Sequence, residues 1–233
     1  MHALDGLSVI VTNAATDLGR GVCAGLERAG ARVTSQLDAH DVSGAQLIQR
    51  AVRAFGCLDA LVTCPTLEPR LCGPAESLAL DSFLGGISSN LSDTFFDCQA
   101  AAAQMLQQVC PHATPNNRGR IITMTSVAGV VALPGHVAFC SAMAGLTAAT
   151  RVLATEWGPR GIRVAAVGAG LSAELLAGVQ PAGASARRVP AHAIVTPDQV
   201  AEAVCILLGE AANGVAGSTL YVDGGWLADG YWE

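Results

Sequence analysis

Short apolar runs alternate with helix-like patterns along the whole chain. Continuous apolar runs, typical of strands buried on both faces, occur at residues 7–13, 58–64, 119–126 and 162–170, and shorter β-rich runs at 31–37 and 218–225. Apolar residues at helical spacing follow the first five runs in chain order, at 18–30, 44–56, 80–109, 139–161 and 196–209. This alternation predicts an α/β fold with a Rossmann-like, doubly wound and mostly parallel sheet, covered by helices on both faces.

The ends of several elements carry recognisable signals. Gly56 closes one predicted helix, and Thr196 is placed to cap the last helix, with Pro197 at its first position. Segments 65–74 and 178–190 are rich in Pro and Gly and are predicted as loops.

Length, composition and charge narrow the class of protein. The 233 residues suit one domain with a large core, so we treat 1–233 as a single domain. A net charge of −6 gives no basic field for nucleic acid or acidic lipid. The first residues lack a signal-peptide pattern, and the apolar runs end before the ~18 to 20 residues that span a bilayer. We therefore expect a cytoplasmic protein that binds neither nucleic acid nor membrane.

Eight cysteines and five histidines raise the question of a disulfide framework or a metal site. No two cysteines form a C-x-x-C pair, and most lie inside apolar patterns, which favours free thiols that pack as small core residues. No histidine lies at metal-ligand spacing from another histidine or a cysteine. No metal is expected.

Three stretches together resemble the short-chain dehydrogenase/reductase (SDR) family: SSNLSDTFFDCQAA (88–101), the segment from GRIITMTS to IRV (119–164), and TPDQVAEAVCILLG with GSTLYVDGG (196–225). The resemblance covers nearly the whole chain. It implies a domain that usually binds NAD(P), interconverts a carbonyl and an alcohol, and forms tetramers.

The family's cofactor loop, T-G-x-x-x-G-x-G, reads TNAATDLG here, so Asn13 and Asp17 replace glycines and only Gly19 is kept. Asn13 can adopt the left-handed backbone that the turn requires. Asp17 puts a carboxylate where the pyrophosphate would lie. It either fills the anion site from within the chain or is an ordinary N-cap, and both interpretations disfavour a cofactor.

The next family segment is shortened. Asp38 is either the acid that binds the ribose or the aspartate of the adenine-side turn, because a strand, helix and strand do not fit in the space available. We predict one edge strand and one helix fewer than usual, lost near residues 34–44. Further along, Asn-Asn-Ala-Gly is replaced by Thr63–Thr66 with Pro65, and the Pro-Gly beside the nicotinamide is Ala169-Gly170.

The family's catalytic Asn, Ser, Tyr and Lys fall on Asn90, Ser126, Phe139 and Met143. Ser126 lies thirteen residues before Phe139, as the family pattern requires. Phe139 has no proton to transfer, and Met143 has neither charge nor donor, so the site is predicted to be packed shut rather than catalytic. Asn90 and Ser126 each have a structural interpretation, a bridge to helix backbone and a cap at a strand end.

Other chemistry in the cleft is weakly indicated. Arg70 and Cys72 lie in the loop PRLCGP, Cys140 follows Phe139, and His136 precedes the helix on the substrate side. No Ser/His/Asp or paired-carboxylate arrangement accompanies them. We interpret Cys140 as a core residue and leave a ligand-facing role open for His136.

The losses concentrate on cofactor and proton-donor positions, whereas the helices that pair subunits in the family, near Phe95–Val109 and Phe139–Trp157, keep their pattern. The tail adds Trp226, Tyr231 and Trp232, which suit either an interface or packing on the chain's own domain. We expect a non-catalytic subunit that joins an active SDR relative in a heterotetrameric NAD(P)-dependent alcohol or hydroxyacyl dehydrogenase, with NAD(P) bound only by that partner. The alternatives are a homo-oligomeric ligand-binding or regulatory protein and a repurposed non-redox enzyme.

Overall fold

The computed structural model describes residues 4–35, 43–176 and 187–229. Its sheet has the order β2-β1-β3-β4-β5-β6, and every neighbouring pair is parallel. The strands are β1 (Ser8–Thr12), β2 (Arg32–Ser35), β3 (Ala60–Thr63), β4 (Gly119–Ser126), β5 (Ile162–Ala169) and β6 (Thr219–Val222). Each observed strand lies within a predicted run, so the predicted parallel α/β fold is confirmed.

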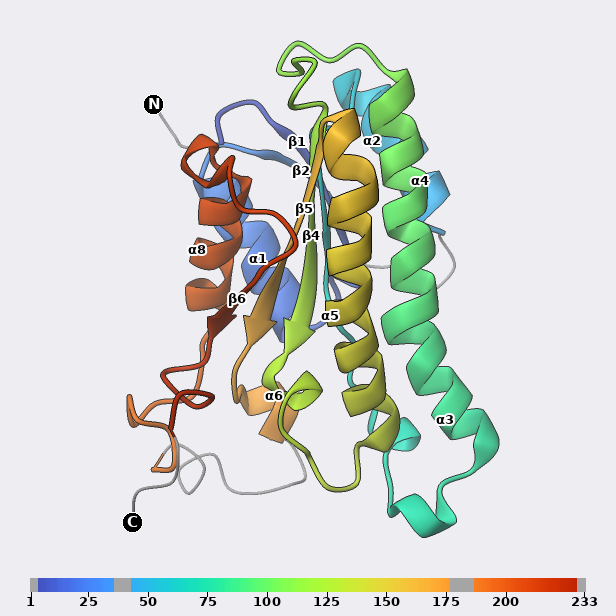
Figure 1. Cartoon of the computed structure of the whole chain (residues 1–233), viewed down its shortest axis with the longest axis vertical. Coiled ribbons are helices and arrows are strands. Elements are labelled where there is room, and N and C mark those ends of the chain that lie inside the picture. Colours follow the sequence, from blue (N-terminus) through green and yellow to red (C-terminus); the bar gives the residue numbers. More distant parts are fainter. Residues whose placement is uncertain (1–3, 36–42, 177–186, 230–233) are drawn as a thin grey trace.

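Helices cover both faces of this sheet (Figure 1). Helices α1 (Asp17–Arg28) and α8 (Pro197–Leu208) pack on one face in a single apolar cluster with β1, β3 and β5. The other face is covered by α2 (Gly44–Phe55), α4 (Asp93–Gln107) and α5 (Val137–Trp157). Shorter helices α3 (Leu80–Ile87) and α6 (Ala173–Leu176) lie toward the carboxyl ends of the strands.

Local capping signals explain where the helices begin and end. In α8, the Thr196 hydroxyl accepts from the Gln199 N–H and the Gln199 side chain accepts from the Thr196 N–H, a reciprocal capping box. Ser43 and Gln46 repeat this arrangement at the start of α2, and Gly56 ends that helix at φ 85°. The caps predicted at Thr196 and Gly56 are therefore observed.

The predicted shortening is also observed. Strand β2 ends at Ser35 and α2 begins at Gly44, and within the described ranges the sheet has six strands with β2 at its edge. The intervening residues 36–42, which include Asp38, lie outside the described part, so the two interpretations of Asp38 stay open.

The cysteine prediction is wrong for two residues. Cys57 and Cys110 form a disulfide across a sequence separation of 53, with 5.6 Å between their Cα atoms. Because the two residues are far apart in sequence and lie at the ends of different elements, no local spacing pattern reveals the pair. The other six cysteines, all within the described residues, form no disulfide.

The expectation that no segment could span a bilayer needs correction as well. Residues Val137–Arg160 form a helical segment long and apolar enough by length and composition. Its many alanines, with Val, Leu and Met, raise its hydropathy, and it runs along β4 and β5 with Ala142, Leu146 and Leu153 buried. A core helix that packs on a sheet satisfies the same criterion.

Candidate functional site

The carboxyl ends of β1, β3, β4 and β5 meet at one edge of the sheet, where doubly wound folds bind ligands. The cleft at this edge has a volume of only about 30 Å³. Leu18, Leu67, Phe139 and Leu175 contribute apolar side chains to its walls, and Ser126 lines it as well. Ligand pockets for small molecules usually measure roughly 300 to 1,000 Å³, so side chains fill most of the space that such a pocket would need.

The turn after β1 keeps its left-handed backbone. Asn13 has φ 52°, which confirms that asparagine takes the conformation of the missing glycine. Its Nδ2 donates to the Cys64 carbonyl at 3.0 Å and so ties this turn to the end of β3.

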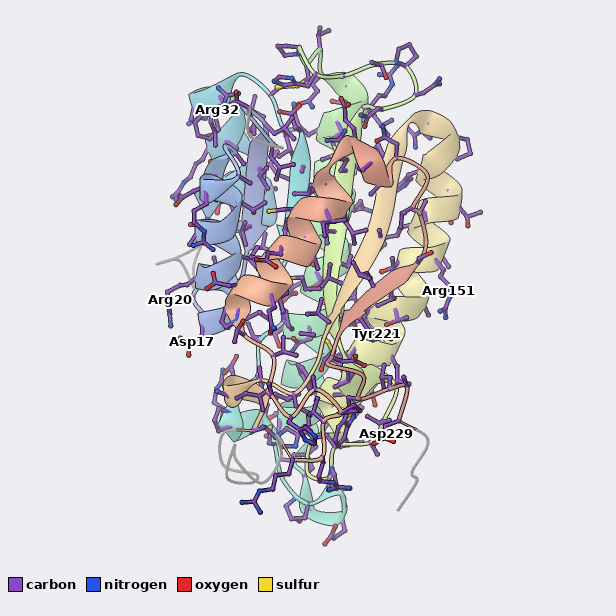
Figure 2. All side chains as sticks on the ribbon, turned by 90° about the vertical axis from the view of Figure 1, so that its left-hand side faces the viewer. Asp17, Arg20, Arg32, Arg151, Tyr221 and Asp229 are labelled. Atoms are coloured by element: carbon purple, nitrogen blue, oxygen red, sulfur yellow. A yellow bond between two sulfur atoms is a disulfide. The ribbon has the colours of Figure 1, made fainter. Side chains whose placement is uncertain are left out.

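The N-cap of α1 is Thr16, not Asp17. The Thr16 hydroxyl accepts from the Gly19 N–H at 3.0 Å. Asp17 occupies the first turn, where its carboxylate pairs with Arg20 at 2.5 Å, and Arg20 also donates to the Ala15 carbonyl. Figure 2 shows the two side chains together on the outside of the molecule. The predicted cap by Asp17 is wrong because the residue before it has the extended backbone that capping requires, with ψ 160°.

Gly19 remains for a packing reason. A Cβ added there would lie 2.6 Å from the Ala14 Cα and 2.9 Å from the Asn13 carbonyl oxygen. The first turn of α1 therefore presses directly on the preceding loop, and no larger residue fits.

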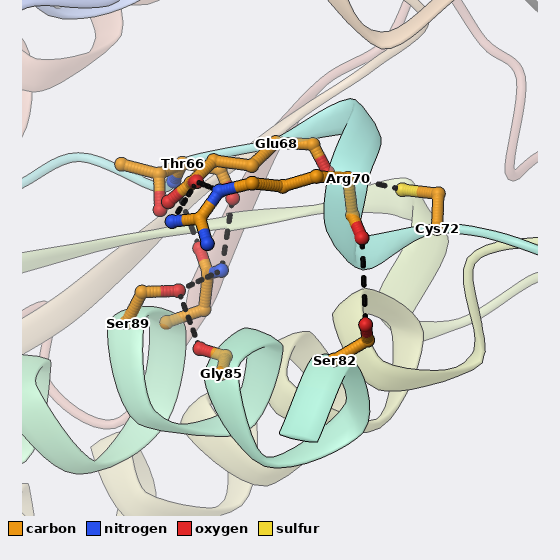
Figure 3. Close-up of polar contacts among 8 residues, drawn as sticks. Thr66, Glu68, Arg70, Cys72, Ser82, Gly85 and Ser89 are labelled. Carbon is orange, nitrogen blue, oxygen red and sulfur yellow. Dashed lines mark hydrogen bonds and ion pairs between the residues drawn. The ribbon is translucent and has the colours of Figure 1, made fainter. Parts of the chain in front are cut away.

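Asn90 is buried in a π-helical segment, Ser88–Ser92, and its side chain is fully engaged. Its Oδ1 accepts from the Thr66 N–H at 2.8 Å, and its Nδ2 donates to the Thr66 carbonyl at 2.8 Å and the Gly86 carbonyl at 3.2 Å. Figure 3 shows the loop that contains Thr66 lying over α3, together with the contacts of Ser89 and Ser82. Asn90 thus links helix and loop backbones directly.

The other three tetrad positions lie next to one another. Ser126 ends β4, and its hydroxyl accepts from the Ala128 N–H at 3.2 Å, so it caps the following turn. Phe139 and Met143 are 6% and 0% exposed and belong to an apolar cluster with Leu171, Leu175 and other residues. Their side chains thus pack mainly among apolar residues.

The remaining candidates have structural partners. The buried His136 ring contacts the Pro134 carbonyl at 2.9 Å, and the Cys140 thiol points to the Leu133 carbonyl at 3.9 Å. Arg70 forms an exposed ion pair with Glu68 at 2.6 Å. Cys72 donates to the Glu68 carbonyl at 3.5 Å, and burial raises the pKa of this thiol. In the described part of the chain these groups form no nucleophile–base pair.

The end of β6 packs against Gly170, the residue that follows β5. The Gly170 N–H donates to the Val222 carbonyl at 2.9 Å, and a Cβ on Gly170 would lie 2.6 Å from the Asp223 Cα. Asp223 in turn accepts from the Gly225 and Leu227 N–H groups, both at 2.9 Å. Trp226 packs on the chain's own apolar cluster, whereas Tyr231 and Trp232 lie outside the described residues.

Known proteins resemble this chain over most of its length. A family profile described as enoyl-(acyl carrier protein) reductase matches residues 2–227. The D-threitol dehydrogenase of Mycolicibacterium smegmatis is 33% identical over an alignment of 253 positions, gaps included. The alignment covers 96% of this chain and 94% of that protein. The chain belongs to the short-chain dehydrogenase/reductase family.

Further similarities agree with this SDR assignment. The 2-dehydro-3-deoxy-D-gluconate 5-dehydrogenase of Escherichia coli is 29% identical over an alignment of 258 positions, gaps included, which covers 97% of each chain. A crystal structure of ribose-5-phosphate isomerase from Brucella melitensis 16M has a TM-score of 0.84 at 28% identity, covering 100% of this chain and 96% of that one. An SDR structure from Mycobacterium marinum, 22% identical with a TM-score of 0.84, covers 97% of both chains and supports the fold.

One ionisable residue of this SDR chain was missed by the sequence analysis. Asp97 lies on α4 against Gly44, where a Cβ on Gly44 would meet its Oδ1. Burial raises the pKa of Asp97 to about 6, and the charge of Asp93 adds to the rise. Its position between Phe96 and Cys98 in a helical pattern gave no signal, because the burial depends on contact with α2.

Proposed function

We propose that this chain is a non-catalytic SDR subunit that assembles with a catalytically active relative into a hetero-oligomeric NAD(P)-dependent alcohol or hydroxyacyl dehydrogenase. In that assembly the partner binds NAD(P), and this chain supplies a structural or regulatory surface. The observation that carries the proposal is the filled cleft, about 30 Å³ in volume, with Phe139 and Leu175 among its walls.

The residues at the cofactor loop do not fit a dinucleotide. A pyrophosphate binds at a helix N-terminus through free N–H groups and needs glycines for close approach. Here the Gly19 N–H is taken by Thr16, and the Asp17 carboxylate stands in the first turn of α1. A negative charge at this point repels a phosphate.

The residues at the reaction centre do not supply a proton donor. Loss of a general acid or base typically costs about 10²- to 10⁴-fold in rate. The hydroxyl of Ser126 and the amide of Asn90 already bond to backbone groups, and Phe139 and Met143 carry no titratable group. The cleft therefore favours an architectural role over a catalytic one.

A partner-binding role is supported by the outward face of α4 and α5, which stand side by side in Figure 1. Phe96 on α4 is 59% exposed and Val152 on α5 is 53% exposed. Aromatic and aliphatic residues exposed on neighbouring helices are typical of subunit interfaces. Helices near Phe95–Val109 and Phe139–Trp157 were predicted for this role, although α4 ends at Gln107 and Val109 lies in the loop beyond it.

The test is co-expression of this chain with its nearest relative that keeps an intact glycine loop and Tyr/Lys pair. We expect a mixed oligomer by size-exclusion chromatography with light scattering. Phe96→Asp should weaken the mixed oligomer by about 2 kcal/mol or more, because it places a charge in an apolar contact. Ile206→Asp is the matched control, since Ile206 is 60% exposed on α8 in the opposite layer.

Calorimetric titration of the isolated chain with NADH and NADPH completes the test. We expect no binding. Micromolar nucleotide binding would contradict the closed cofactor site, and formation of homo-oligomers alone beside the relative would rule out the subunit role.

A further inference from the structure

A second and larger pocket lies at the other end of the sheet. It has a volume of about 410 Å³ and is formed where β4 begins, with contributions from the loop after α4 and from the turn after α8. In Figure 1 the strand arrows point away from this end of the molecule. The pocket is therefore separate from the filled cleft and shares no lining residue with it.

A buried arginine whose Nε makes no hydrogen bond lines this pocket. Arg120 on β4 is 7% exposed, and its Nε has no hydrogen-bond partner. Among the described residues its guanidinium also makes no ion pair. Burial lowers the pKa of Arg120 and the charges of Glu210 and Asp59 raise it, but neither acid forms an ion pair with the guanidinium. The buried Nε is therefore left for an acceptor from outside the chain.

The neighbouring strand adds a second positive charge. Arg163 on β5 is opposite Arg120 in the parallel register and is 9% exposed. It donates to the carbonyls of Ala212 and Gly209, which are neutral acceptors. Burial and the charge of Arg120 together lower the pKa of Arg163 to about 10. Two adjacent buried cations favour an anion more strongly than either alone.

The acidic residues near the pocket act on Arg120 without forming an ion pair with it. Asp59 accepts from the Ser8 N–H through Oδ2 at 2.8 Å, and its Oδ1 lies 2.8 Å from the Cys110 sulfur. Glu210 and Asp5 line the pocket but are exposed to solvent. They are placed to accept hydrogen bonds at the mouth rather than to pair with Arg120.

We propose that this pocket binds a small molecule through a carboxylate or phosphate group placed against the Arg120 guanidinium. The fork of guanidinium N–H donors matches two oxygens of such a group. Arg118 and Asn117 line the same pocket and offer further donors, while Glu210 and Asp5 would accept from hydroxyl or ammonium groups on the ligand. The acids at the mouth disfavour extended polyanions. This site is independent of the proposed subunit role.

The experiment uses the full chain and two probes, inorganic phosphate and succinate, at constant ionic strength balanced with chloride. We expect saturable binding of at least one probe by calorimetric titration, with one site per chain and a rise in Tm. Arg120→Met should weaken that binding by about 10- to 100-fold. Arg151→Met, which removes an exposed arginine on α5, should leave it unchanged.

Two further measurements keep the proposal open to refutation. Without ligand, Arg120→Met should be at least as stable as the wild type, because it replaces an unpaired buried charge with an apolar side chain. Asn117→Asp leaves Arg120 in place and adds a negative charge to the pocket, so it should also weaken binding by about tenfold. Preference for phosphate or for succinate identifies the anionic group. The proposal is overturned if neither probe binds the wild type, or if Arg120→Met and Asn117→Asp both bind as tightly as it does.

Discussion

Phe139 and Met143 are packing residues at the first turns of α5. Full burial of a side chain of this size contributes roughly 1.5 to 3 kcal/mol. The hydroxyls of Thr125 and Thr147 both donate to the Met143 carbonyl, at 3.1 and 2.9 Å, and fix the backbone at this point. The polar groups here therefore serve the helix backbone and leave none for a reacting molecule.

Met143→Lys would restore the family residue and should still harm this protein. Met143 is fully buried in an apolar cluster, and a lysine there would have to lose its charge or open the cluster. We expect a loss of about 3 kcal/mol in the free energy of unfolding, measured by urea denaturation. Met143→Leu is the control and should cost less than about 1.5 kcal/mol. Equal stability of the lysine variant would show that the cluster admits water.

Asp97 should make stability depend on pH. Its pKa is about 6 in the folded chain against an ordinary value of 3.8, so the folded state binds a proton more tightly than the unfolded state. The proton bound to Asp97 therefore adds to the free energy of unfolding. This stabilisation is fully present below about pH 4 and is lost as pH rises through 6. Asp97→Asn should flatten this dependence and raise stability at pH 8 by about 2 kcal/mol, allowing for partial exposure.

Thermal unfolding between pH 4 and 8 measures this effect. Glu202→Gln is the control, because Glu202 is exposed on α8, on the other face of the sheet from α4. If both variants retain the wild-type slope, Asp97 is ionised normally in the folded chain.

At the residue scale, the predicted placement of Ser126 at a strand end and of Phe139 and Met143 on a helix is observed, but the sequence did not separate Thr16 from Asp17 as the cap. Both residue types cap helices well, and the choice depends on the backbone of one residue, which no pattern encodes. The partner of Asn90 was also beyond reach, since the loop at Thr66 meets it across the fold.

At the scale of elements, α1 and α8 pack closely against each other. A Cβ on Gly21 would lie 2.2 Å from the Pro197 Cβ, and one on Gly25 would lie 2.5 Å from the Ala201 Cβ. Arg28 and Asp198 join the same helices through an exposed ion pair at 2.6 Å. Gly21 and Gly25 thus allow α1 and α8 to approach closely, in the same helix that keeps Gly19 of the family's cofactor loop.

Gly25→Ala tests this contact between helices. The added methyl group would overlap Ala201, so we expect a loss of about 1 to 3 kcal/mol in stability despite the better helix propensity of alanine. Gly158→Ala is the control, because nothing lies within 4 Å of its added Cβ and its φ is −54°. Chemical denaturation of both variants gives the comparison, and an unchanged Gly25→Ala variant would mean that α8 can shift away.

Most elements were predictable because their apolar spacing and capping residues act locally. The π-helical turn at Ser88–Ser92 was not, since the helical pattern continues through it without a break. Its presence depends on Asn90 reaching a separate loop.

At the scale of the whole molecule, the two ends of the sheet have different characters. The carboxyl end is filled to about 30 Å³, whereas the amino end holds a pocket of about 410 Å³ beside two buried arginines. The parallel sheet and the loss of one strand could be predicted, because alternating strands and helices favour parallel strands and the stretch near residues 34–44 is too short for a further strand and helix. The pocket could not, since Arg120 and Arg163 each lie in an apolar strand pattern and meet only when β4 pairs with β5.

The disulfide between Cys57 and Cys110 makes a covalent ring of the chain between them. This ring contains β3, the loop with Arg70, α3 and α4, while both chain ends leave it near the same edge of the sheet. A protease cut in the exposed stretch around Glu76 would therefore open the ring without releasing a fragment. Nicked and intact molecules would keep the same mass, apart from one added water, until a reductant separates the two pieces.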